Sequence, residues 1–85
     1  MGVGMVEVHL WSGLRQVTGG EQVVELEAAT VGEVLDGLVK VHPGLAPFIE
    51  AGVSVAVDGE IVASDRSAPV PEGAEVFLVQ KLKGG

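Results

Sequence analysis

The residues best suited to chemistry are two glycines, Gly84 and Gly85, at the end of the stretch VQKLKGG. Because they have no side chains, they form a strip that fits a channel too narrow for a Cβ atom and takes backbone angles closed to other residues. A carboxylate at Gly85 is unreactive toward acyl transfer until a partner enzyme adenylates it. Attack by sulfur on the acyl adenylate then gives a thiocarboxylate, whereas attack by an amine gives an amide.

Other candidate catalytic groups are isolated along the sequence. There is no cysteine, and His9 and His42 lie on different expected elements without a second ligand at useful spacing, which favours ordinary surface histidines over a metal site. Glu25 and Glu27 share one strand face, where neighbouring carboxylates are usually only solvated. No GxxxxGK[ST] phosphate loop is present. The sequence therefore predicts a non-catalytic domain that itself binds no cofactor, metal or ATP.

Composition limits the class of protein. Eighty-five residues with 47% hydrophobic content suffice for one small core. The formal net charge of −7 argues against nucleic-acid binding, so a charged partner should be basic, unless the charge serves only solubility. We find no basic leader followed by an apolar segment and no run of about 18 apolar residues, which predicts a cytoplasmic protein without a membrane partner.

Alternating or extended apolar patterns predict five β-strands, at residues 5–11, 22–28, 53–57, 60–63 and 74–80. Residues 12–22 are expected to be a turn region that joins the first two strands as a hairpin. Asp58-Gly59 is typical of a tight turn and predicts a second hairpin. Residues 45–52 are expected to be a short connector whose Phe48 and Ile49 plug one end of the core.

One main helix is predicted between the hairpins. Thr30 and Glu33 fit a capping box, in which each side chain satisfies a free backbone N–H, and Pro43 follows as a helix stop. An apolar stripe at helical spacing comprises Val31, Val34, Leu35, Leu38 and Val39. The pattern predicts an α+β fold with a mixed sheet packed on one main helix, in which residues 1–80 form a single domain and 81–85 a flexible tail.

The hairpin, the helix, the segments VSVAVDGEIV and PEGAEVFL and the terminal glycines together resemble the ubiquitin-like sulfur carriers of the MoaD/ThiS family. The resemblance implies a β-grasp fold and activation by a separate, ubiquitin-activating-like adenylyltransferase that uses ATP. It also implies a thiocarboxylate on Gly85, with Gly84 as its permissive neighbour. The expected sulfur acceptor is a molybdopterin synthase large subunit or another acceptor.

The segment before the glycines departs from the resemblance. Many molybdopterin carriers have a proline-containing stretch there, whereas this chain has Gln80, Lys81, Leu82 and Lys83, which are closer to the tail of ubiquitin. The departure leaves the pathway open between molybdopterin, thiamin and tRNA thiolation. Lys81 and Lys83 either pair with acidic groups in a partner's channel or keep the tail soluble.

A partner-binding surface is predicted on the sheet face opposite the helix. By strand alternation Trp11, Phe77 and Val79 point outward, and Ile61 joins them from its short strand. The resemblance implies that these positions form the hydrophobic patch that meets the activating enzyme and the sulfur acceptor, together with Lys81, Leu82 and Lys83 of the tail. The alternative is that the 12–20 loop or the tail covers Trp11 or Phe77.

Three functions fit these residues. The first is a sulfur carrier that acts through a Gly85 thiocarboxylate. The second is a ubiquitin-like modifier joined to lysines through Gly85. The third is a plain β-grasp interaction domain whose two glycines are incidental.

Overall fold

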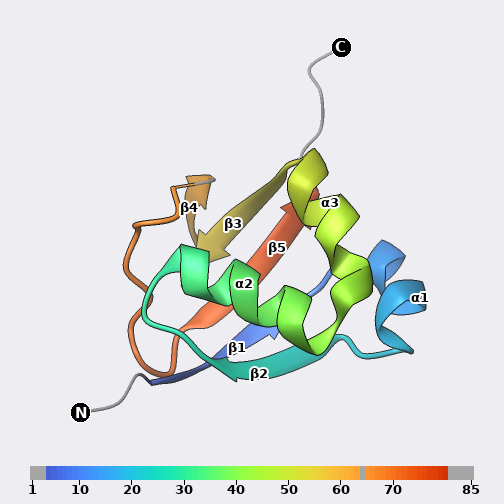
Figure 1. The fold of residues 1–85 in the computed structure, drawn as a ribbon. Coiled ribbons are helices and arrows are strands. Elements are labelled where there is room, and N and C mark those ends of the chain that lie inside the picture. The colour runs from blue at the N-terminus through green and yellow to red at the C-terminus, as the bar shows by residue number, and fades with distance from the viewer. Residues whose placement is uncertain (1–3, 64, 81–85) are drawn as a thin grey trace.

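The structure, a computed structural model, describes residues 4–63 and 65–80. Helices cover one face of a twisted sheet and leave the other face open (Figure 1). The elements along the chain are β1 (Met5–His9), the 3₁₀ helix η1 (Ser12–Leu14), α1 (Arg15–Thr18), β2 (Val23–Glu27), α2 (Val31–Val41), the 3₁₀ helix η2 (Pro43–Leu45), α3 (Ala46–Ala51), β3 (Val53–Val57), β4 (Glu60–Ala63) and β5 (Glu75–Gln80). Among these helices, none is both long enough and apolar enough to cross a bilayer.

The sheet is mixed, and its last strand in sequence lies in its middle. The strand order is β2-β1-β5-β3-β4, with β1 and β5 parallel and the other neighbouring pairs antiparallel. The main helix α2 packs across the covered face (Figure 1). The predicted α+β arrangement of a mixed sheet on one main helix is therefore confirmed.

The core lies between this helix and the inner sheet face. The strand residues that alternation predicts to point inward are buried, except Leu10, which is half-buried against the core. Four of the five residues of the helix stripe are buried, while Val39 is half-buried. The largest completely buried side chains are Leu14, Leu38, Leu45, Val6, Val8, Val31, Val34, Val55 and Val76. Burial of alternate residues on each strand fixes which residues remain for the outer face.

The start of α2 is capped by its own side chains and by the loop before β5. Thr30 Oγ1 accepts from the backbone N–H of Glu33 at 3.3 Å, as predicted. Glu33 Oε1 accepts from the backbone N–H of Ala29 at 2.7 Å, so this side chain also satisfies a backbone N–H. Gly32 N donates to Arg66 O at 2.8 Å, and a Cβ at Gly32 would lie 3.1 Å from that oxygen. This close approach explains a glycine in the first helical turn.

The predicted turn region at 12–22 is wrong in part, because its first half is helical. Leu14, at the end of η1, is fully buried, and Thr18 in α1 is buried with its hydroxyl donating to Glu21 O at 2.8 Å. Gly19, with φ of 72°, ends α1 in the left-handed conformation. These short helices close one end of the core. They bury only Leu14 and Thr18, which is too few residues for a helical pattern to be visible in the sequence.

The predicted connector at 45–52 is also helical. Pro47 lies in the first turn of α3, where proline is tolerated because its missing N–H has no helical partner. The core plug at this end is Leu45, and Ile49 packs against the core as expected. The expectation for Phe48 is wrong, because its side chain is 40% exposed.

Candidate functional site

The described chain ends on the central strand, directly before the predicted reactive segment. Gln80 is the last residue of β5, and it pairs with Val53 of β3. The reactive glycines Gly84 and Gly85 lie outside the described residues, as do Lys81, Leu82 and Lys83. Their roles stay predictions. The strand that leads to them is the central strand of the sheet, with β1 on one side and β3 on the other.

The outer face carries one row of side chains that crosses all five strands. Directly paired residues lie on the same face of a sheet, so the register of the four strand pairs defines the row. We call it the central row; its members, from β2 to β4, are Val23, His9, Phe77, Ala56 and Ile61. It is a continuous, mainly apolar band on the face that the helices leave uncovered.

Two rings stack in the middle of this row. The centroids of His9 and Phe77 lie 4.4 Å apart and their planes differ by 16°, so the imidazole covers part of the phenyl face. Phe77 nevertheless remains 39% exposed, Val79 40% and Ile61 61%. Apolar groups this exposed and this close together are typical of a binding surface.

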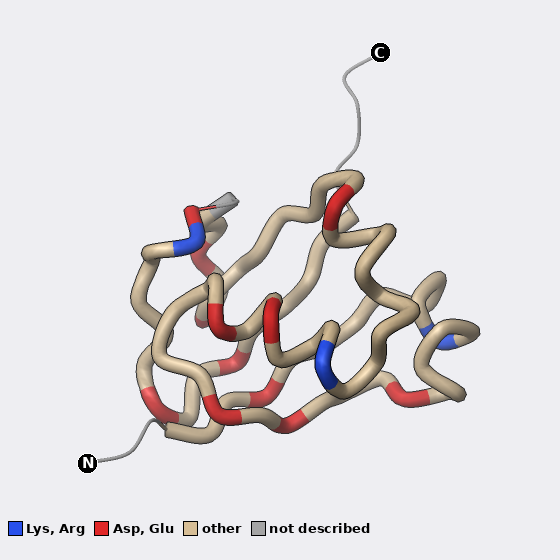
Figure 2. Tube along the Cα trace, viewed as in Figure 1, with Lys and Arg blue, Asp and Glu red and all other residues tan. Residues whose placement is uncertain are grey.

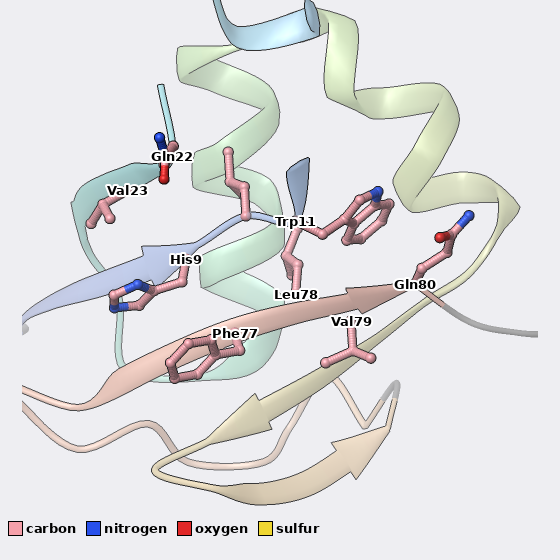
Figure 3. A pocket seen from close by; sticks show the side chains of 9 residues that line it. His9, Trp11, Gln22, Val23, Phe77, Leu78, Val79 and Gln80 are labelled. Atoms are coloured by element: carbon pink, nitrogen blue, oxygen red, sulfur yellow. The ribbon is translucent and has the colours of Figure 1, made fainter. Parts of the chain in front are cut away.

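Three of the four predicted partner-binding residues of the folded domain line one hollow. Trp11, Phe77 and Val79 surround an open hollow of about 370 Å³ at the junction of β1 and β5 (Figure 3). The remaining lining residues are His9, Leu10, Gln22, Val23, Leu78 and Gln80. Because Gln80 is among them, the hollow adjoins the point where the C-terminal segment begins. Ile61 lies outside the hollow, two strands from Phe77 on the same row.

Trp11 reaches the hollow by a different route from the one predicted. The predicted strand to residue 11 is too long, because β1 ends at His9 and the chain turns into η1, where Leu14 N donates to Trp11 O at 3.0 Å. The indole is half-buried and packs against the core. Trp11 is thus partly a structural residue, whereas Phe77 and Val79 project from a strand as expected.

A second row beside the central row is acidic. Glu7 pairs directly with Glu25 on β2 and with Glu75 on β5, and we call these three residues the glutamate row. His9 Nε2 lies 3.7 Å from Glu7 Oε1, buried and without a hydrogen-bond partner. Ligand atoms of Glu7, His9 and Glu75 fall within 4.8 Å of one another. Sequence spacing had given His9 no second ligand; parallel pairing of β1 with β5 brings Glu75 beside it.

Two residues that build this surface, His9 and Ala56, were not predicted from the sequence to be part of it. His9 was read as an ordinary surface residue, although strand alternation already placed it on the same face as Glu7. Ala56 on β3 pairs with Phe77 on one side and with Ile61 on the other. It is a small side chain, 7% exposed, between two larger ones. The missing information was the order of the strands. Alternation assigns each side chain to one face of the sheet, but it does not say which strand lies beside which.

The mixed five-stranded sheet around a main helix, with its last strand in the centre, defines a ubiquitin-like β-grasp protein. The sequence model of the ThiS family matches residues 8–85. The chain belongs to the ThiS family, one of the ubiquitin-like families of sulfur carriers and protein modifiers. A comparison with curated proteins found no match.

Solved structures of similar fold include both carriers and modifiers. The small archaeal modifier protein SAMP1 from Haloferax volcanii is 29% identical, with a TM-score of 0.75 over 96% of this chain and 100% of that one. A chain of the Amycolatopsis orientalis BexX/CysO complex is 30% identical, with a TM-score of 0.76 over 94% and 99%. A putative molybdopterin converting factor subunit 1 from Pyrococcus furiosus, 21% identical, shares the fold with a TM-score of 0.77 over 93% and 99%.

Proposed function

We propose that this protein is a sulfur carrier whose Gly85 carboxyl group is converted to a thiocarboxylate by a partner enzyme. The observation that carries the proposal is the match to the ThiS family through residue 85, which includes the two terminal glycines. The central strand β5 supports it, because this strand ends at Gln80, which lines the exposed hollow directly before residue 81.

The chemistry takes two steps on one carbonyl carbon. The Gly85 carboxylate attacks the α-phosphorus of ATP held by a ubiquitin-activating-like adenylyltransferase, which forms an acyl adenylate and releases pyrophosphate. A hydrosulfide ion then attacks the acyl carbon, AMP leaves with the pair of electrons of the C–O bond, and loss of the S–H proton gives the thiocarboxylate. Gly84 and Gly85 supply the narrow backbone that the enzyme's channel requires. The carrier itself binds neither ATP nor another cofactor in this scheme.

The folded domain supplies recognition. The hollow at Trp11, Phe77 and Val79 and the rest of the central row dock on the partner, while Lys81, Leu82 and Lys83 follow into its channel. Ordering a flexible segment costs about 1–2 kcal/mol per residue, and apolar docking of the sheet face offsets that cost. The same surface meets the adenylyltransferase and then the sulfur acceptor, for which we propose a molybdopterin synthase large subunit. Thiamin and tRNA thiolation are the alternative pathways.

The decisive experiment is an intact-mass measurement on the protein from its own cells. The protein is incubated with ATP, the host adenylyltransferase and a sulfur donor, and the expected change is replacement of one oxygen by sulfur within the C-terminal peptide. A variant with one residue added after Gly85 is the control, and it should fold and remain unmodified. An unchanged mass with an enzyme shown to be active on another carrier would refute the proposal.

A second function, protein modification through Gly85, is favoured by the 29% identity to a small archaeal modifier protein. Attack of a lysine amine on the same acyl adenylate releases AMP and gives an isopeptide bond. An epitope-tagged chain expressed in its host distinguishes the two, because conjugation yields bands of high molecular weight that disappear when Gly84 and Gly85 are deleted. A carrier without modifier activity gives no such bands.

A further inference from the structure

The three side chains of the glutamate row repel one another on the exposed face of the sheet. Glu25, Glu7 and Glu75 are directly paired across three adjacent strands. Like charges placed directly opposite each other on a sheet are destabilising. The pairing of the strands does not require glutamate at these positions, since the neutral glutamine side chain has the same size and would fit there. The fold therefore carries this row at a cost in stability.

Basic side chains of the described chain do not neutralise the row. Among residues 4–63 and 65–80, the strands carry no Lys or Arg, and the three basic residues lie in α1, in α2 and in the loop before β5 (Figure 2). The last of these, Arg66, pairs with Asp36 of α2 at 2.9 Å. The outer face of the sheet thus presents an unbalanced negative strip.

The negative strip runs beside the apolar central row. Glu7 and His9 are two positions apart on β1, as are Glu75 and Phe77 on β5, so the two rows lie about 6–7 Å apart. One partner surface of ordinary size covers both rows together. Apolar contact supplies affinity there, while the charges fix the orientation and speed the encounter.

We infer that the adenylyltransferase that docks on this face carries a strip of Arg or Lys side chains beside its apolar patch, facing Glu25, Glu7 and Glu75. This rests on the proposed function. Charge complementarity selects the occupant, because each glutamate that repels its neighbours in the free protein gains an opposite charge in the complex.

The test is the kinetics of adenylation by the host enzyme, with the double variant Glu7→Gln/Glu75→Gln against the unaltered chain. Two lost charge pairs should raise the KM for the carrier about fivefold at low salt and leave kcat unchanged. The dependence of KM on salt should become shallower. Removing the repulsion should also raise the Tm by about 1–3 °C. Glu50→Gln on α3, which removes one negative charge on the helix side, should leave KM unchanged.

Other outcomes overturn the inference. A double variant with unaltered KM and salt dependence shows that the row does not meet a basic strip. If Zn²⁺ raises the Tm of the unaltered chain but not that of the double variant, Glu7 and Glu75 serve a cation instead. If the unaltered chain is not adenylated at all, the proposed function itself fails and this inference fails with it; adenylation with equal KM values refutes the inference alone.

Discussion

The two faces of the sheet use similar residues for opposite purposes. On the inner face Val8, Val55 and Val76 are completely buried under the helices. On the outer face Phe77 and Val79 come from the same strand as Val76, yet they keep about two-fifths of their surface exposed, at 39% and 40%. Burial of apolar surface drives folding, so the inner residues serve stability. The outer residues remain exposed, and the proposed function assigns them to the binding of a partner.

The contrast extends to polar groups. Thr18 is the buried polar residue of the described chain, and its hydroxyl is hydrogen-bonded. On the outer face the glutamate row lies in solvent, and His9 Nε2 has no partner. The buried polar group is hydrogen-bonded, as stability of the fold requires, whereas the charges of the outer face have no such structural role. Substitutions on the two faces should therefore separate stability from binding.

The largest loss of stability is expected on the inner side, for Leu38→Ala. Leu38 is completely buried in α2, and truncation leaves a cavity that the packed sheet cannot fill. The free energy of unfolding should fall by about 3 kcal/mol, measured by urea denaturation. Titration calorimetry with the adenylyltransferase, at a temperature where the variant is folded, should give nearly unaltered affinity. A loss of affinity as large as the loss of stability would break the separation of the two faces.

The reverse result is expected for Phe77→Ala. Docking affinity should fall about tenfold, because a large ring at the centre of the exposed row is the type of residue that dominates interfaces. The free energy of unfolding should change by only about 1 kcal/mol, since the ring is partly exposed and its main contact is the stack on His9. Phe77 is a cleaner test than Trp11, because the indole also packs on the core.

The matched control for Phe77→Ala is Val41→Ala. Val41 ends α2 on the helix side and is 53% exposed, so it is an apolar residue of at least equal exposure on the face without a proposed partner. Its affinity for the adenylyltransferase should stay unaltered. Equal losses of affinity for both variants would show that docking is not confined to the outer sheet face.

A smaller loss is expected for Thr30→Ala at the start of α2. The variant removes the acceptor for the Glu33 N–H and should lower the free energy of unfolding by about 1 kcal/mol, measured by thermal denaturation. Thr30→Ser keeps the hydroxyl and should recover most of the loss. Affinity for the partner should be unaffected by either. A Thr30→Ser variant as unstable as Thr30→Ala would mean that the methyl group, not the cap, matters.

Sequence alone predicted the faces of the strands well. Alternation in residues 5–11 and 74–80 assigned Val6, Val8, Val76 and Leu78 to the core because a two-residue period has only two sides. The Thr30 cap was equally visible, since it depends on residues three apart. Local rules of this kind work where neighbours in sequence are neighbours in space.

Long-range pairing was beyond the sequence. The central row depends on β5 inserting between β1 and β3, which places Phe77 beside His9 at a separation of many residues. The glutamate row, which alternation gave only as separate outward residues, depends on the same insertion. The helices at 12–18 and 46–51 were missed because each is about one turn long and buries few residues, so no helical period had room to appear.

The smallest effects are expected at Ile61, and they define how far the docking surface extends. Ile61 is 61% exposed on β4 and lies outside the hollow, separated from Phe77 by Ala56 on β3. Ile61→Ala should change the free energy of unfolding by less than about 0.5 kcal/mol, and it should weaken docking about twofold, as a residue at the rim of an interface does. Titration calorimetry of Ile61→Ala, Phe77→Ala and the double variant measures both positions. Additive losses place Ile61 at the rim of the same interface, whereas a loss at Ile61 that exceeds the loss at Phe77 moves the centre of docking from the β1–β5 hollow to the β3–β4 hairpin.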